Sequence, residues 1–74
     1  MHKIRNEKVM KIFGKNVHDI RLSKGYTQEY LAEEAKISQV QVARIESGKL
    51  NTSISTVASL AIALNVEVGE FFKE

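Results

Sequence analysis

The sequence contains no cysteine, no proline and no long apolar run. Without cysteine, the chain can form no disulfide bond. Its two histidines, His2 and His18, have no set of carboxylates around them at the spacing of a metal site, so we expect no metal and no cofactor. The longest apolar run, Leu60 to Leu64, is far shorter than the roughly 20 residues that span a bilayer, and the N-terminus lacks the apolar segment of a signal peptide. We therefore expect a cytoplasmic protein without membrane contact.

The chain is also short: 74 residues, of which 43% are hydrophobic and 27% charged. These values describe one small globular domain. A domain of this size buries only about 60% of the surface that its unfolded chain exposes, so disulfides, metals or oligomerisation often add stability. Because the sequence offers neither of the first two, we expect a homodimer.

Positive charge is concentrated at the N-terminal end of the chain. Residues 1–25 carry seven Lys and Arg against two acids, which gives +5, whereas residues 26–46 sum to −2 and residues 47–74 to −1. Charge alone leaves two interpretations open, a solvated helix face and a surface that binds a polyanion.

Periodic apolar residues predict an all-α fold. In the first predicted helix the buried stripe consists of Val9, Phe13, Val17 and Ile20, with Asn6 as the N-cap and Gly25 as the stop. Thr27 can cap a second helix of about nine residues. Ser38 and Gln41 have the spacing of a capping box for a third helix, which stops at Gly48.

Two more helices are predicted in the C-terminal third. The fourth follows residues 51–53 and ends at Asn65, and its inward residues are Ile54, Val57, Ala61 and Leu64, flanked by Leu60. The last apolar residues, which include Phe71 and Phe72, predict a short fifth helix that packs back onto the others. We expect one of these two rings in the core and the other at a partner surface.

The second and third helices form a helix-turn-helix, and the outward face of the third has the chemistry of a base reader. This face is polar and almost uncharged, and it consists of Ser38, Gln39, Val40, Ala43, Arg44 and Ser47. Glutamine can bridge two atoms of adenine, arginine can fork onto guanine, and Val or the Ala methyl can touch a thymine methyl. Gln28 and Ser38, at helix N-termini, can offer donors to phosphates. The alternative is that these are ordinary solvated residues and that Val40 packs against Ile37 or a neighbouring loop.

The chain resembles the lambda-repressor-like, Cro/Xre-type helix-turn-helix family. The resemblance is carried by Ile20-Arg21 and by the run YTQEYLAEEAKISQVQVARIESGKLNTSISTVASLAIALNV. It implies a single domain over residues 1–74, with a core of about 13–72 and an N-terminal extension at 1–8. It also implies a five-helix bundle that binds operator DNA as a two-fold dimer, with its third helix in the major groove.

The resemblance also implies roles for individual residues. Gln28 would contact a phosphate, Gln39 and Arg44 would contact base edges, and Val40 would make an apolar base contact. Backbone phosphates would be approached by Ser38, Ser47, Lys49 and Asn51.

Two further expectations concern the family's scaffold. Arg21 and Glu46 match positions where the family pairs an arginine with a glutamate, so we predict a partly buried salt bridge that orients the third helix. Where the family has a glycine in the turn, this chain has Lys36, for which a left-handed backbone costs roughly 1–2 kcal/mol. Either the turn tolerates that strain or it relaxes slightly.

The sequence therefore predicts a dimeric transcriptional regulator of a pseudo-palindromic operator, similar to restriction-modification controller proteins. A prophage or mobile-element repressor and a DNA-binding antitoxin are the alternatives, so a toxin or RNA polymerase is a further candidate partner. The expected dimer surface consists of Ile62, Val68, Phe71 and Phe72. Catalysis is not expected, because the chain lacks a glycine-rich phosphate loop and because His18 and Asp19, as neighbours on a helix, should diverge.

Overall fold

The computed structural model describes residues 5–74, so His2 and Lys3 of the N-terminal extension lie outside the described residues. The elements are helices α1 (Glu7–Ser23), α2 (Gln28–Ala35), α3 (Gln39–Glu46) and α4 (Ile54–Leu64), followed by a 3₁₀ helix, η1 (Val68–Phe72). None of the helices in residues 5–74 has the length and apolar content needed to cross a bilayer.

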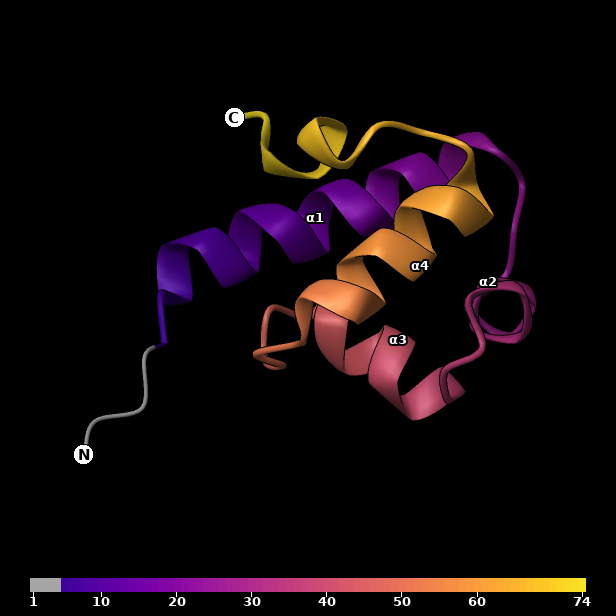
Figure 1. The fold of residues 1–74 in the computed structure, drawn as a ribbon, viewed down its shortest axis with the longest axis horizontal. Helices are drawn as coiled ribbons and strands as arrows, with labels where there is room; N and C mark the ends of the chain where they lie inside the picture. The colour runs from indigo at the N-terminus through magenta and orange to yellow at the C-terminus, as the bar shows by residue number, and fades with distance from the viewer. Residues whose placement is uncertain (1–4) are drawn as a thin grey trace.

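The predicted five-helix bundle is wrong in its last member, because η1 is a 3₁₀ helix. Its five residues are enough for a short 3₁₀ turn, and Gly69 in their middle disfavours an α-helix. The fold is therefore four α-helices and a 3₁₀ turn. The predicted position of this segment is still correct, because η1 packs back onto α1 (Figure 1).

The predicted helix starts are confirmed by their capping hydrogen bonds. The side chain of Asn6 accepts from the backbone N–H of Val9 at 3.0 Å, and that of Thr27 accepts from Tyr30 at 3.0 Å. Ser38 and Gln41 form the capping box in both directions. Short polar side chains thus satisfy backbone donors that have no partner within the helix.

The predicted stops are also confirmed, since each has a left-handed backbone. Gly25 and Gly48 both have φ of 74°, and Asn65 has φ of 56°. Glycine and asparagine reach this region with less strain than other residues, so the chain leaves each helix there.

The core lies where α1, α2, α3, α4 and η1 meet. Its fully buried large side chains are Val17, Leu31, Val42, Ile45, Leu60, Leu64 and Phe71. Two predicted core residues are wrong: Ile54 is 86% exposed, and Val9 is 40% exposed. Met10 is buried instead of Val9, because the buried face of α1 also includes Gly14 and Arg21, and Met10 lies on the same side of the helix as these two residues. Leu60, predicted to flank the stripe of α4, is fully buried, whereas Val57 in the first turn packs against the core while only partly buried.

The C-terminal segment is fixed to α1 by ring packing and by one amide. The ring of Phe13 meets Phe71 edge-on at 5.3 Å and stacks on Phe72 at 5.7 Å between centroids. The Asn16 side chain donates to the carbonyl oxygens of Phe71 and Lys73, both at 2.8 Å. Phe71 is fully buried within the chain, so its assignment to a dimer surface is wrong, whereas Phe72 is 42% exposed.

These contacts place α3 and the C-terminal segment on opposite sides of α1. In Figure 1, α1 crosses the molecule, α3 lies along the lower edge and the yellow C-terminal segment lies along the upper edge. The outward face of α3 is therefore free of cover from the C-terminal segment.

Candidate nucleic-acid interface

The turn between α2 and α3 keeps a left-handed backbone at Lys36, so of the two outcomes left open by the sequence the turn tolerates the strain. Lys36 is left-handed, with φ of 59° and ψ of 41°. The next residue, Ile37, donates its backbone N–H to the carbonyl of Ala32 at 3.0 Å, which closes the end of α2. Ser38 then caps α3, which begins at Gln39 and runs at an angle to α2 (Figure 1). A lysine therefore occupies a conformation that glycine adopts with less strain.

The face of α3 predicted to read bases is open to solvent. Val42 and Ile45 turn inward and are at most 1% exposed, which orients the rest of the helix. Gln39 and Arg44 are exposed and have no side-chain hydrogen bond or ion pair with any residue in 5–74, and Val40 is 69% exposed. Val40 therefore does not pack into the core, and Ala43 lies half-buried at the edge of the face.

The two serines of this face are exposed but already hydrogen-bonded within α3. The Ser38 hydroxyl accepts from the backbone N–H of Gln41 at 3.1 Å and lies 3.3 Å from the Gln41 side-chain oxygen. The Ser47 hydroxyl donates to the carbonyl of Arg44 at 3.0 Å. Their predicted phosphate contacts stay predictions, and each would compete with these local bonds.

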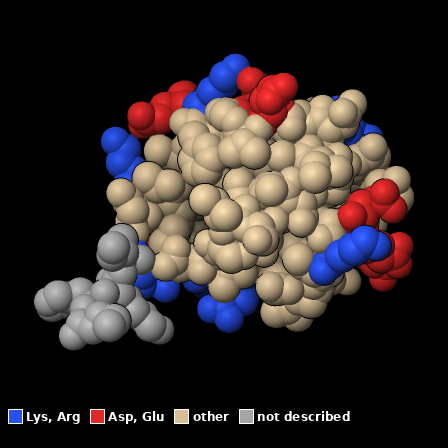
Figure 2. All heavy atoms as spheres, viewed as in Figure 1, with Lys and Arg blue, Asp and Glu red and all other residues tan. Residues whose placement is uncertain are grey.

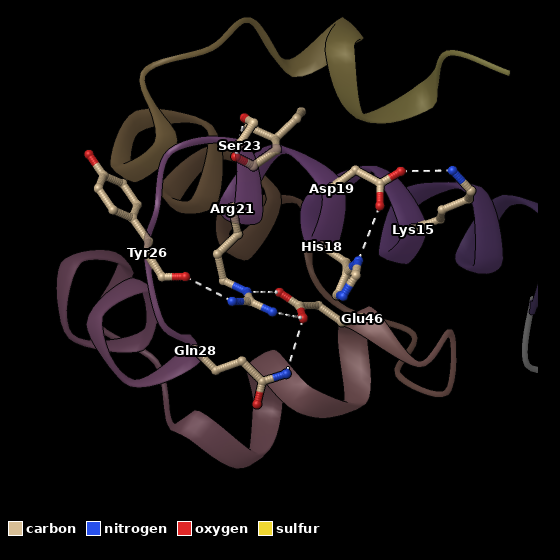
Figure 3. Close-up of polar contacts among 9 residues, drawn as sticks. Lys15, His18, Asp19, Arg21, Ser23, Tyr26, Gln28 and Glu46 are labelled. Carbon is tan, nitrogen blue, oxygen red and sulfur yellow. Dashed lines mark hydrogen bonds and ion pairs between the residues drawn. The ribbon is translucent and has the colours of Figure 1, made fainter.

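The predicted salt bridge is confirmed. Arg21 Nε donates to Glu46 Oε2 at 2.7 Å, and Arg21 Nη2 donates to Oε1 at 3.0 Å (Figure 3). The side chains are only 9% and 3% exposed, and Arg21 Nη1 also donates to the carbonyl of Tyr26 at 2.8 Å. The hydrogen bond to Glu46 raises the pKa of Arg21, against the opposing effect of burial. A planar two-point pair of this kind fixes the last turn of α3 against α1.

Gln28 belongs to the same network. Its side-chain nitrogen donates to Glu46 Oε1 at 3.0 Å, so the amide at the first position of α2 is held toward the end of α3 (Figure 3). An amide nitrogen carries two hydrogens, which leaves one donor for a second acceptor such as a phosphate oxygen. The predicted phosphate contact of Gln28 is thus compatible with its internal bond.

Gly14 is a structural requirement that sequence reasoning missed. A Cβ atom built on Gly14 would lie 2.0 Å from the carbonyl oxygen of Ile45 in α3. The backbones of α1 and α3 therefore touch at this point, which only glycine permits. A glycine inside a helical pattern is the signal that could have indicated it, because such a residue needs a packing reason.

The expectation that His18 and Asp19 diverge is wrong. His18 Nδ1 lies 3.1 Å from Asp19 Oδ1, and Lys15 Nζ donates to Asp19 Oδ2 at 2.7 Å (Figure 3). Both side chains are long enough to bend back to each other at the helix surface. The hydrogen bonds from Lys15 and then His18 lower the pKa of Asp19.

The charges around α3 are positive. In Figure 2 the lower edge of the molecule, where α3 and the loop after it lie in Figure 1, has Lys and Arg but no Asp or Glu. Acidic side chains gather at the upper and right-hand edges of the same view. Arg44 in α3 and Lys49 in the loop after it are exposed, and neither forms an ion pair with a described residue.

Comparison with known protein families matches residues 17–71 to the helix-turn-helix family. The chain belongs to this family. Its type is the Cro/Xre type, as the sequence predicts, and members of this group are transcription regulators that bind DNA.

Individual relatives agree with this assignment. The chain is 36% identical over 61 residues to the immunity repressor protein of Bacillus phage phi105, an alignment that covers 82% of this chain but only 42% of that repressor. Among solved structures it is similar to the restriction-modification controller protein C.AhdI from Aeromonas hydrophila, with 33% identity, a TM-score of 0.83 and coverage of 85% of this chain and 96% of that one. The wild-type controller protein C.Esp1396I is 28% identical with a TM-score of 0.79, covering 86% of this chain and 83% of that one.

Proposed function

We propose that this helix-turn-helix regulator binds double-stranded DNA in a sequence-specific manner, with α3 in the major groove of an operator. The observation that carries the proposal is the outward face of α3, which is exposed and holds Gln39 and Arg44 without a side-chain partner among residues 5–74. The major groove admits an α-helix, and each base pair presents a distinct set of donors and acceptors there.

The side chains of this face divide into readers of bases and binders of phosphate. Arg44 is proposed to fork onto guanine O6 and N7, and Gln39 to bridge adenine N6 and N7. Val40 and Ala43 are proposed to touch thymine methyl groups. The proposed phosphate contacts come from Gln28, Ser38, Ser47, Lys49 and Asn51. Contacts of this second kind position the protein on the duplex without specifying sequence.

Arg21 and Glu46 are proposed to act through geometry. Their bond lies behind α3 and holds Gln28 in place, so it fixes the angle at which α3 and α2 meet a duplex. Neither side chain is exposed enough to bind DNA itself. We propose that both are positioning residues.

The regulator is proposed to act as a homodimer on a pseudo-palindromic operator. Ile62 is 80% exposed on α4, and Val68 and Phe72 are each about two-fifths exposed near the C-terminus. The face of the molecule over α4 is almost free of charge, with charged side chains confined to its rim (Figure 2). Two-fold pairing would place two copies of α3 about 34 Å apart, one turn of the duplex.

Two kinds of regulated gene are supported by different relatives. The similarity to C.AhdI and C.Esp1396I favours control of restriction-modification genes, and the similarity to the phi105 protein favours repression in a prophage. Both assign the chain to the control of transcription. We propose the controller role first, because its relatives match this chain over most of their own length.

The test is selection of bound duplexes from a random pool at a stated salt concentration, carried out with the unaltered chain and with Gln39→Ala and Arg44→Ala. The unaltered chain should enrich a pseudo-palindromic sequence. Each variant should lose preference at its own position in both half-sites, with about 1–3 kcal/mol less discrimination there. Glu29→Ala is a suitable control, because Glu29 is exposed on α2 outside the reading face.

Two results would contradict the proposal. If the unaltered chain enriched no sequence, the proposal of sequence-specific DNA binding would be contradicted. A uniform drop in affinity for both variants, with the preference unchanged, would reassign Gln39 and Arg44 to the DNA backbone.

A further inference from the structure

Lys11, a residue outside the helix-turn-helix, lies directly against the turn that ends α3. A Cβ atom built on Gly48 would meet Lys11 Cγ at 3.0 Å, its Cα at 3.3 Å and its Cβ at 3.6 Å. The N-terminal half of α1 therefore touches this turn through both the backbone and the stem of Lys11. The contact fixes the positions of Lys11 Cα and Cβ, from which the exposed side chain extends.

Lys11 also differs from the other basic residues of α1 in having no ion pair with a described residue. Lys8 pairs with Glu74 at 3.6 Å, Lys15 with Asp19 at 2.7 Å and Arg21 with Glu46 at 2.7 Å. The ammonium group of Lys11 is thus the one on α1 whose charge is not offset by a neighbouring carboxylate within residues 5–74. It is free for a partner outside the chain.

Two more cations that form no ion pair within the described part of the chain lie next to this contact. Lys49 directly follows Gly48, and its backbone N–H donates to the carbonyl of Arg44 at 2.9 Å. Both Lys49 and Arg44 are exposed. Arg44 in the last turn of α3, Lys49 just after Gly48 and Lys11 against Gly48 therefore lie around the C-terminal end of α3. Three cations that form no ion pair with a residue in 5–74 make a positive surface that continues from α3 onto α1.

We propose that Lys11 binds a phosphate of the DNA backbone beside Lys49, so that α1 is part of the DNA-binding surface. This inference rests on the proposed function. When α3 lies in the major groove, the residues flanking it approach the phosphates that border the groove. Lys11 is held against this flank by Gly48, so its ammonium group reaches the same strand of phosphates as Lys49. A lysine needs no particular base for such a contact, so Lys11 adds affinity without changing sequence preference.

The salt dependence of binding tests this directly. Each phosphate contact contributes about −0.9 to the slope of log affinity against log salt for duplex DNA. Affinity for the duplex enriched from the random pool is measured over a series of salt concentrations for the unaltered chain, Lys11→Gln and Lys15→Gln. Lys15 is the matched control, because it lies one turn further along α1, is exposed and is already paired with Asp19. Both substitutions remove one positive charge from the same helix.

The expected result is a slope for Lys11→Gln that is shallower by about 0.9 for each protomer bound, whereas the slope for Lys15→Gln stays at that of the unaltered chain. The bases enriched by Lys11→Gln should be the same as before, and Lys11→Arg should restore the slope. Thermal unfolding monitors the fold of each variant, and glutamine keeps part of the stem that covers Gly48.

Equal slopes for Lys11→Gln and Lys15→Gln would overturn this inference while the proposed function stands, provided that the unaltered chain still binds its selected duplex. A change in the bases enriched by Lys11→Gln would also overturn it, because a phosphate contact carries no base preference. Absence of DNA binding by the unaltered chain would instead remove the proposed function and this inference together.

Discussion

At the scale of single residues, the bond between Arg21 and Glu46 gives a sharp prediction. Arg21→Ala should lower the free energy of unfolding by about 3 kcal/mol, because it leaves Glu46 charged and nearly buried without its two-point partner. Equilibrium denaturation measures the loss. Replacing the whole pair, Arg21→Met with Glu46→Leu, should cost much less, since apolar residues of similar size need no partner. An unchanged denaturation curve for Arg21→Ala would show that the bond adds no stability.

Gly14 provides the second prediction at this scale, and here two effects have opposite signs. Alanine is favoured over glycine inside a helix by about 1 kcal/mol, so propensity alone would make Gly14→Ala stabilising. The added Cβ, however, would lie 2.0 Å from the Ile45 carbonyl oxygen, so α3 would have to move away from α1. We expect overpacking to dominate, with a net loss of about 1–3 kcal/mol in the free energy of unfolding.

Gly69→Ala is the control for this substitution. A Cβ on Gly69 would meet nothing within 4 Å, and its φ lies outside the left-handed region. Its urea denaturation curve should shift little or toward greater stability. If Gly14→Ala behaved like Gly69→Ala, the backbones of α1 and α3 would be further apart than described here.

Apart from the Arg21–Glu46 pair, which the family resemblance implied, the residues that were placed correctly from the sequence are those whose reason is local. Asn6, Thr27 and Ser38 cap helices through bonds to residues three positions away, so their pattern can be seen in the sequence. The close approach at Gly14 and the contact of Lys11 with Gly48 could not be predicted in this way. Each owes its role to a contact with the end of α3, which is distant along the chain and depends on how two helices cross.

At the scale of elements, the same distinction explains the errors in the buried faces. Spacing located α1 and α4 but misjudged which of their residues turn inward, so Val9 and Ile54 are exposed. The inner face of α1 follows its crossing with α3 at Gly14, and that of α4 follows its packing against α2. The outward face of α3 was predicted correctly, because Val42 and Ile45 define the inner side of so short a helix.

The turn between α2 and α3 carries the prediction that belongs to this scale. Lys36→Gly should raise Tm by a few degrees, because glycine adopts φ of 59° without the roughly 1–2 kcal/mol that a side chain costs there. The greater freedom of glycine in the unfolded chain offsets part of this gain. Differential scanning calorimetry measures the shift.

The comparison for this turn is Lys24→Gly. Lys24 also follows a helix but has φ of −94°, so glycine relieves no strain there. The Tm of Lys24→Gly should fall, because only the added freedom of the unfolded chain remains. A fall of similar size for Lys36→Gly would mean that the turn holds Lys36 without strain.

At the scale of the whole molecule, the outward face of α3 and the exposed apolar residues of the C-terminal segment have different orientations. The face of α3 lies at the lower edge in Figure 1, and the C-terminal segment with Val68 and Phe72 lies at the upper edge. The acidic residues of that segment, such as Glu67 and Glu70, are therefore far from the edge proposed to meet phosphate. A partner seated over α4 and this segment would leave both copies of α3 free for a duplex.

Dimerisation is the prediction that joins these surfaces to function. Ile62→Glu should dissociate the dimer, because a charge would replace an apolar side chain that is 80% exposed in one copy and that we propose to be covered in two. Tyr30→Glu serves as the control, since Tyr30 is 43% exposed on α2, outside the proposed surface. Sedimentation at tens of micromolar, without DNA, should give a dimer for the unaltered chain and for Tyr30→Glu, and a monomer for Ile62→Glu. The monomer should still bind a single half-site. It should bind the full operator more weakly than the dimer does, because it loses the gain in affinity from engaging both half-sites at once. If the unaltered chain sedimented as a monomer, the proposed dimer surface would be contradicted. DNA binding would then have to come from α3 of one copy alone.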